Sequence, residues 1–168
     1  MHKMIFRVTD KLSRKIKTGP LIILPPDSNP YADWAARLFT CNRCQYILIT
    51  NTTSLYSMIL YGRGIPDEHS FINEVLRSMR EFLTSQGHEC IWDRMIAPHL
   101  TEIAFSRAFS RQVTGSMNDI EFQAKVTMHY HGVSPHELSV RLNEVPFTML
   151  PGFARPCDVF PKMIASNQ

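Results

Sequence analysis

The residue types best suited to bind a ligand lie in one segment, Ser110 to Asp119, which reads Ser-Arg-Gln-Val-Thr-Gly-Ser-Met-Asn-Asp. The pattern predicts a short strand over Arg111–Thr114, then Gly115, then a helix that begins with Ser116 as its cap. The first N–H groups of a helix and the positive end of its dipole favour an anion, and a glycine lets the anion approach closely. The segment therefore predicts an anion-binding site.

Two arginines precede this helix start. Arg107 and Arg111 could hold the same anion in a bidentate clamp. The simpler alternative is that Ser116 and Asp119 form a capping box, which stabilises the helix by about 1 kcal/mol and binds nothing. The segment is neither a Walker phosphate loop nor a dinucleotide fingerprint, because no second glycine followed by Lys and Ser or Thr is present.

A second polar group, Arg141-Leu142-Asn143-Glu144, ends a helix that Ser134-Pro135 begins and Pro146 terminates. We expect it to point into the same groove as the first group. The alternative is a surface ion pair between Arg141 and Glu137, one helical turn apart. The predicted ligand-binding residues are Arg107, Arg111, Gly115, Ser116, Asn118, Asp119, Arg141 and Asn143.

For catalysis the sequence offers little. It contains no Gly-x-Ser-x-Gly elbow and no cysteine in a recognisable catalytic context. Asp119 and Glu144 are the candidate catalytic carboxylates, which would act with a divalent ion, although their spacing alone does not support this role. His129-x-His131 lacks a nearby cysteine or carboxylate to complete a ligand set. We predict no metal ligands, and the cofactor is unknown.

The pair Cys41-x-x-Cys44 lies between two β-prone segments, with Asn42-Arg43 as the connection. Because Asn tolerates positive φ, the pattern favours a two-residue hairpin with the two cysteines opposite each other. A redox pair and a metal site are the alternatives. Cys90 and Cys157 are isolated, so no disulfide framework is predicted.

Hydrophobic periodicity predicts the elements that position these residues. The chain should fold as a single α+β domain over residues 1–150, followed by a proline-containing tail over 151–168. We expect an antiparallel sheet of about five strands with three main helices packed largely on one side. The predicted strands are Met4–Val8, Trp34–Cys41, Gln45–Thr50, Leu55–Tyr61 and Glu102–Phe105. The predicted helices are Asp10–Lys17, Pro66–Gln86, Ser116–His129 and one beginning at Ser134.

Composition is that of a globular protein, with 44% hydrophobic and 20% charged residues. No apolar run approaches the roughly 20 residues that cross a bilayer, and no secretory signal is visible, so we expect a cytoplasmic location. The net charge of +3 is uneven. Residues 1–20 hold six Lys and Arg against one Asp, a net +5 that leaves −2 for the rest. This end could face nucleic acid, or could be a solvated helix face.

Two blocks carry a family resemblance: Ser110 to Asp119, and Arg141-Leu142-Asn143-Glu144-Val145-Pro146. They resemble an uncharacterised bacterial family, the domain of unknown function numbered 6933, and the likeness covers most of residues 4–150. The chain departs from the family pattern at Gln112 and at the Cys41 and Cys44 pair. The resemblance implies a bacterial or mobile-element origin. It does not point to any particular activity.

Three functional hypotheses follow. The first is a cytoplasmic domain that binds an anionic ligand, either nucleic acid or a nucleotide phosphate, through the Arg111 groove and the basic N-terminal helix. The second is a metal-dependent, nuclease-like enzyme that uses Asp119 and Glu144. The third is a protein-interaction module of a defence or toxin–antitoxin system.

Overall fold

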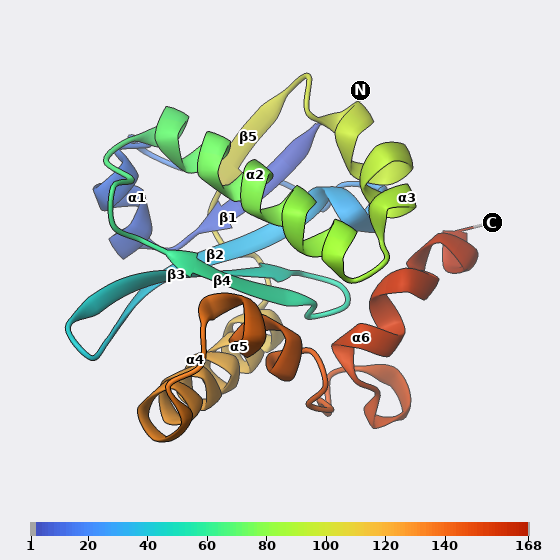
Figure 1. The fold of residues 1–168 in the computed structure, drawn as a ribbon. Helices are drawn as coiled ribbons and strands as arrows, with labels where there is room; N and C mark the ends of the chain where they lie inside the picture. Colours follow the sequence, from blue (N-terminus) through green and yellow to red (C-terminus); the bar gives the residue numbers. More distant parts are fainter. Residues whose placement is uncertain (1–2, 168) are drawn as a thin grey trace.

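The computed structural model describes residues 3–167. A five-stranded sheet with strand order β4-β3-β2-β1-β5 forms its centre (Figure 1). The strands are β1 (Met4–Val8), β2 (Asp33–Cys41), β3 (Cys44–Asn51), β4 (Ser57–Tyr61) and β5 (Ile103–Ser106).

The sheet is mixed, so the prediction of a purely antiparallel sheet was wrong. Strand β1 lies parallel to both β2 and β5, whereas β2, β3 and β4 form an antiparallel meander. All five residues of β1 are buried, as is typical of a central strand covered on both faces. Two long connections, residues 9–32 before β2 and residues 62–102 before β5, provide the crossovers that parallel pairing with β1 needs.

Helices cover both faces of the sheet, which corrects the expectation that they pack largely on one side. Helix α2 (Glu68–Ser85) lies on one face, and α4 (Arg111–His131) with α5 (Pro135–Leu142) lies on the other (Figure 1). The remaining helical segments are α1 (Asp10–Ile16), α3 (Glu89–Ile91), α6 (Pro156–Val159) and the short turns Pro30–Ala32, Trp92–Ile96, Ala97–His99, Pro151–Phe153 and Phe160–Asn167.

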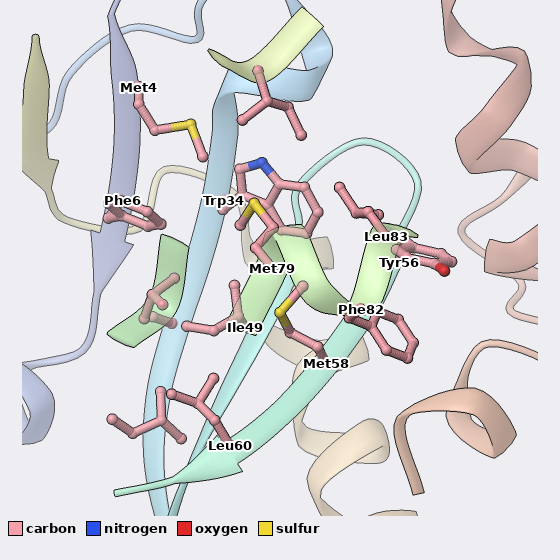
Figure 2. Packing of buried hydrophobic residues seen from close by; sticks show 14 of the residues in the cluster. Met4, Phe6, Trp34, Ile49, Tyr56, Met58, Leu60, Met79, Phe82 and Leu83 are labelled. Atoms are coloured by element: carbon pink, nitrogen blue, oxygen red, sulfur yellow. The ribbon is translucent and has the colours of Figure 1, made fainter. Parts of the chain in front are cut away.

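The larger core lies between the sheet and α2 (Figure 2). Helix α2 begins with a capping box between Asp67 and Ser70. It buries one apolar stripe, formed by Phe71, Val75, Met79, Phe82 and Leu83. The C-terminal segment joins this core through Phe160, which is fully buried and stacks on Tyr56 with ring centroids 4.3 Å apart.

The hairpin predicted between the two neighbouring cysteines is confirmed. Cys41 lies opposite Cys44, and the turn residues Asn42 and Arg43 have φ values of 50° and 66°. Both central residues therefore have the positive φ that a type I′ turn requires. Cys41 and Cys44 are free thiols in this structure.

Side chains of α5 cover the outer edge of β4. Ser139 Oγ accepts a hydrogen bond from the Ile59 N–H at 2.8 Å. Asn143 bonds both backbone groups of Ser57: its Oδ1 accepts from the N–H at 2.7 Å, and its Nδ2 donates to the carbonyl at 2.8 Å. These contacts satisfy backbone groups that an open edge strand would expose.

Substitution Asn143→Ala should destabilise the fold, because it leaves two backbone groups of Ser57 buried without partners. Each such group costs about 1–3 kcal/mol of unfolding free energy. Urea unfolding should show this loss, whereas the control Asn73→Ala, on the exposed face of α2, should change the free energy by no more than about 0.5 kcal/mol. Equal values for the two variants would contradict the edge-covering role.

No helix in the part of the chain that the structure describes is long and apolar enough to cross a membrane.

Candidate functional site

Helix α4 begins at Arg111, five residues earlier than predicted. Ser110 is the N-cap, and its Oγ accepts a hydrogen bond from the Val113 N–H at 3.2 Å. The predicted strand over Arg111–Thr114 and the helix start at Ser116 were therefore wrong. The buried residues of α4 are Val113, Met117, Ile120, Ala124 and Met128, so the helical period already includes Val113.

This earlier start changes the roles of Gly115 and Ser116. Both lie inside the helix rather than at its positive end, and the Ser116 Oγ contacts Met149 Sδ at 3.7 Å. The N–H groups and the dipole end that favour an anion lie instead beside Ser110 and Arg111. The positive end of the helix therefore lies about one and a half turns earlier than the sequence predicted.

Gly115→Ala should stabilise the protein by about 0.5–1 kcal/mol, because alanine costs less backbone entropy in a helix interior. A Cβ at this position would meet no atom within 4 Å. Thermal unfolding of the variant tests this directly. A lowered melting temperature would indicate that the backbone at position 115 requires glycine. That result would favour the helix start at Ser116 that the sequence predicted.

The other predicted ligand-binding residues are divided between several places. Arg107 is exposed and pairs with Asp10 at 3.6 Å. Arg141 forms the surface ion pair with Glu137, at 2.8 Å. Asn143 is occupied by the edge of β4. The fold therefore does not bring the Arg141 group into the groove beside α4.

An open hollow of about 390 Å³ lies at the start of α4. It brings together three of the predicted residues, Arg111, Gly115 and Asn118, with the connection from β5. Asp119 lies next to Asn118 on α4 and is exposed. Residues of the predicted segment Ser110 to Asp119 thus do share one surface, although α4 begins at Arg111 rather than at Ser116.

A smaller inner cavity of about 90 Å³ adjoins this hollow. The two share Ala108, Phe109, Ser110 and Thr114 as lining residues. The inner cavity reaches the sheet, where Arg7 of β1 and Arg37 of β2 line it. Arginine is the only charged residue type that lines either space among the described residues, through Arg7, Arg37 and Arg111.

Arg37 is the most unusual of these side chains. Only 8% of the residue is exposed, and its Nε has no hydrogen-bond partner among the described residues. Its Nη1 donates to Asn118 Oδ1 at 2.6 Å, and its Nη2 donates to the Thr114 carbonyl at 3.2 Å. Asn118 and Thr114 therefore hold the guanidinium against the first turns of α4.

The charge of Arg37 is only partly compensated. The nearest carboxylate, on Glu121, lies 3.9 Å from Nη1. Burial lowers the pKa of the Arg37 guanidinium, and Glu121 offsets part of that decrease in pKa. A buried cation that is only partly neutralised gains more from an incoming anion than a solvated one does.

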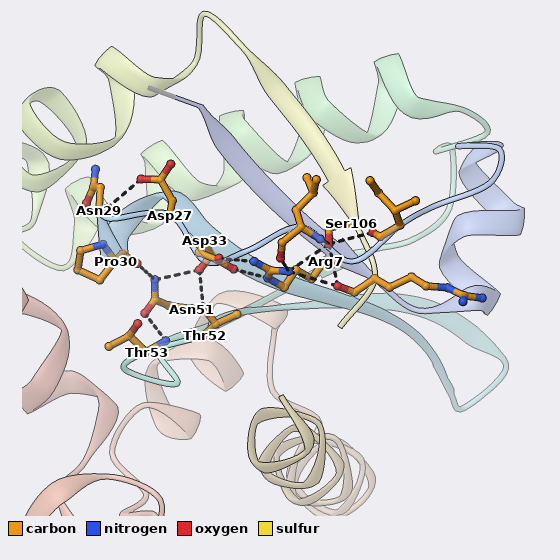
Figure 3. A network of polar contacts seen from close by, with 12 residues as sticks. Arg7, Asp27, Asn29, Pro30, Asp33, Asn51, Thr52, Thr53 and Ser106 are labelled. Carbon is orange, nitrogen blue, oxygen red and sulfur yellow. Dashed lines mark hydrogen bonds and ion pairs between the residues drawn. The ribbon is translucent and has the colours of Figure 1, made fainter. Parts of the chain in front are cut away.

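Arg7 has a different, structural role (Figure 3). Its Nε and Nη2 bind the two carboxylate oxygens of Asp33, each at 2.8 Å, and the two side chains are 1% and 4% exposed. Its Nη1 donates to the Leu24 carbonyl at 2.8 Å and to Ser106 Oγ at 3.1 Å. Arg7 thereby ties β1, β2 and β5 to the segment that runs beside β5.

The turn after β3 joins the same network. Asn51 Nδ2 donates to the Pro30 carbonyl at 2.8 Å, and Thr52 Oγ1 donates to the Asp33 carbonyl at 3.2 Å (Figure 3). Asn51 Oδ1 also accepts from the Ser54 N–H at 2.9 Å. These bonds fix the position of Thr52, which lines the inner cavity.

A third cavity, of about 630 Å³, lies on the far side of Thr52 and Phe109, both of which line it and the inner cavity. Its charged lining residues are Asp27, Asp33, Asp158 and Lys162. Phe109 lines all three spaces, and the Arg7 Cζ lies 4.3 Å from its ring centroid. The charged residues that line these spaces are therefore arginines on one side of Phe109 and mainly aspartates on the other.

Sequence reasoning missed Arg7 and Arg37 as site residues. Each stands alone in an apolar strand, between Phe6 and Val8 and between Ala36 and Leu38. An arginine within a strand whose neighbours are all apolar is a signal in itself, because such a side chain needs partners or a ligand when it is buried.

The candidate catalytic carboxylates show no shared site. Asp119 and Glu144 are both exposed, on α4 and just after α5. No group of three or more His, Cys, Asp or Glu side chains placed to hold a metal ion occurs among the described residues.

Comparison with protein families identifies the group to which the chain is related. The model of the domain of unknown function DUF6933 matches residues 5–158. The chain belongs to this family. The family predicted from the two sequence blocks is thus confirmed, and the match includes Arg7, Arg37 and the start of α4. Searches of curated proteins and of solved structures found no match.

Proposed function

We propose that this member of the DUF6933 family binds the phosphate of a nucleotide or nucleic acid at the N-terminal end of α4. One observation carries the proposal. The cavity there is lined by arginines and no carboxylate among the described residues, and one of those arginines, Arg37, is buried with an unpartnered Nε. A phosphate oxygen is a suitable acceptor for a guanidinium N–H.

The start of α4 adds a second source of attraction for an anion. The helix has 21 residues, so its peptide dipoles are well aligned, and its first turn lines both the hollow and the inner cavity. Helix N-termini bind phosphate through backbone N–H groups. Arg37, which is bonded to Thr114 and Asn118 of the same helix, would act on the anion together with the helix N-terminus.

The size of the inner cavity limits what enters it. About 90 Å³ is well below the roughly 300–1,000 Å³ that is usual for small-ligand pockets. A single phosphoryl group fits this space, whereas a continuous nucleic-acid backbone would have to remain in the open hollow. The geometry thus favours a terminal phosphate over the middle of a strand.

Titration calorimetry of the full chain tests the proposal with inorganic phosphate, adenosine monophosphate, and short single-stranded RNA and DNA. We expect binding of at least one phosphate compound, with a dissociation constant that increases with salt concentration. Affinity that does not change between low and high salt, or no binding by any of them, would contradict it.

The predicted cytoplasmic location and bacterial origin stay predictions.

One feature favours the alternative of a protein-interaction module. Phe122, Val126 and Tyr130 follow one another at four-residue spacing on α4 and are 68%, 39% and 74% exposed. An apolar stripe of this kind commonly marks an interface, and a second copy of the chain is the partner that the purified protein can test. Sedimentation analysis should then show a dimer that Tyr130→Ser abolishes. A monomer at all concentrations would exclude self-association through α4.

A further inference from the structure

The cavity of about 630 Å³ beside the anion site, together with Phe109, indicates which molecule carries the phosphate. We propose that the ligand is a mononucleotide, whose base occupies this cavity while its phosphate reaches Arg37. This inference rests on the proposed function and goes further, because it assigns a second site and the chemical class of the whole ligand.

The size and position of the cavity fit this division. Pockets for small ligands commonly measure about 300–1,000 Å³, and this one adjoins the inner cavity through two shared lining residues, Thr52 and Phe109. Its apolar walls include Pro26, Pro30, Val159 and Met163. A molecule with an apolar body and one phosphate could therefore place each part in the space of matching size.

Phe109 can stack on a planar base. The Arg7 guanidinium lies 4.3 Å from its ring centroid and occupies one face of the ring, yet 44% of Phe109 is exposed. Arg7 covers only one face of the ring, so a base could stack on the opposite face. Stacking of a base on an aromatic ring contributes about 1–3 kcal/mol, whichever base it is. Phe109, which lines all three spaces, is thus a candidate platform for the base.

The inner cavity and the larger cavity also differ in charge, as a phosphate site and a base site should. Arginines line the inner cavity, whereas three aspartates and one lysine line the larger one. Asp33 is held by Arg7 and Asp158 by Arg155, but Asp27 Oδ1 accepts from a backbone N–H, that of Asn29, at 2.8 Å. A carboxylate there disfavours a second anionic group and can accept hydrogen bonds from the N–H groups of a base.

The experiment compares four ligands on the wild type and three variants of the full chain. Calorimetric titrations use inorganic phosphate, ribose 5-phosphate, adenosine monophosphate and a short oligoribonucleotide. The forms are the wild type, Phe109→Ala, and the control Phe122→Ala, which removes an exposed phenylalanine from α4 outside the cavities. Phe109→Leu, which keeps apolar volume but no ring face, guards against loss of fold, and thermal unfolding checks each variant.

We expect adenosine monophosphate to bind at least tenfold more tightly than ribose 5-phosphate. Phe109→Ala should weaken its binding by about 5- to 150-fold, the range that the stacking energies correspond to. The affinity for inorganic phosphate, which has no base to stack on the ring, should fall by much less. Phe109→Leu should act in the same direction, and Phe122→Ala should have no effect on any ligand.

Other results would overturn the inference and are distinguishable from failure of the proposed function. Equal affinity for ribose 5-phosphate and adenosine monophosphate, or equal behaviour of the two alanine variants, would remove the base site and leave the anion site standing. Tighter binding of the oligoribonucleotide than of the mononucleotide would replace the mononucleotide by RNA. Absence of binding by every phosphate compound would overturn both proposals.

Discussion

Replacing Arg7 by methionine should destabilise the protein by about 3–5 kcal/mol, the usual cost of breaking a buried ion pair by removing one partner. The substitution leaves the Asp33 carboxylate, which is 4% exposed, without the two hydrogen bonds that now neutralise it. It also leaves the Leu24 carbonyl without its donor. A domain of this size has a total stability of roughly 5–15 kcal/mol, so the loss should be conspicuous.

Urea unfolding of the variants measures this effect. The matched control is Arg77→Met, because Arg77 also pairs with carboxylates, Glu74 and Glu81, but is exposed on α2, where the pair contributes little. Asp33→Asn should be destabilising as well, and the double variant should lose less than the sum of the two single losses, since the two residues interact directly. Equal stability of Arg7→Met and Arg77→Met would contradict the structural role of Arg7.

Replacing Arg37 by glutamine should weaken binding of a phosphate ligand by about 10- to 150-fold. Hydrogen bonds to charged groups contribute about 1.5–3 kcal/mol each, and the variant loses both the charge and the unpartnered Nε. Arg37→Lys keeps the charge but not the planar fork, so we expect an intermediate affinity. Calorimetric titration with adenosine monophosphate gives the three values.

Arg141→Gln is the control for this series. Arg141 was predicted to bind the same ligand, but it is exposed and pairs with Glu137 on α5. The structure therefore predicts wild-type affinity for this variant. If Arg141→Gln weakened binding as much as Arg37→Gln does, the ligand would lie elsewhere than the start of α4, and the assignment made from geometry would be wrong.

The strands and α2 could be predicted from the sequence because each has a strong local pattern. The meander from β2 to β4 consists of β-prone runs separated by turn residues, and α2 has a full apolar stripe between a capping box and a glycine. The direction of β1 could not be predicted in the same way, because strand pairing depends on contacts far apart in sequence. The largely apolar character of Met4–Val8, interrupted by Arg7, was nevertheless compatible with a parallel central strand.

The start of α4 was mispredicted because Gly115 was taken as a break and Ser116 as a cap. A glycine is tolerated inside a helix when buried residues on either side pack well. Here Val113 and Met117 both belong to the hydrophobic core between the sheet and α4. The same error placed the predicted anion site at Ser116, whereas the proposed one lies at the helix start beside Ser110. Asn118, one of the predicted ligand-binding residues, lines the hollow at the start of α4, and its Oδ1 accepts a hydrogen bond from Arg37 Nη1.

The most direct test of the central claim is a ¹⁵N-correlated NMR titration of the full chain with adenosine monophosphate. It follows the backbone amides of α4 and the Nε–H signal of Arg37, which has no protein partner in this structure. The account predicts that the Arg37 Nε–H and the amides of Arg111 to Thr114 shift together and saturate at the same ligand concentration. Shifts confined to α5 around Arg141, or an unchanged Arg37 signal at saturation, would contradict it.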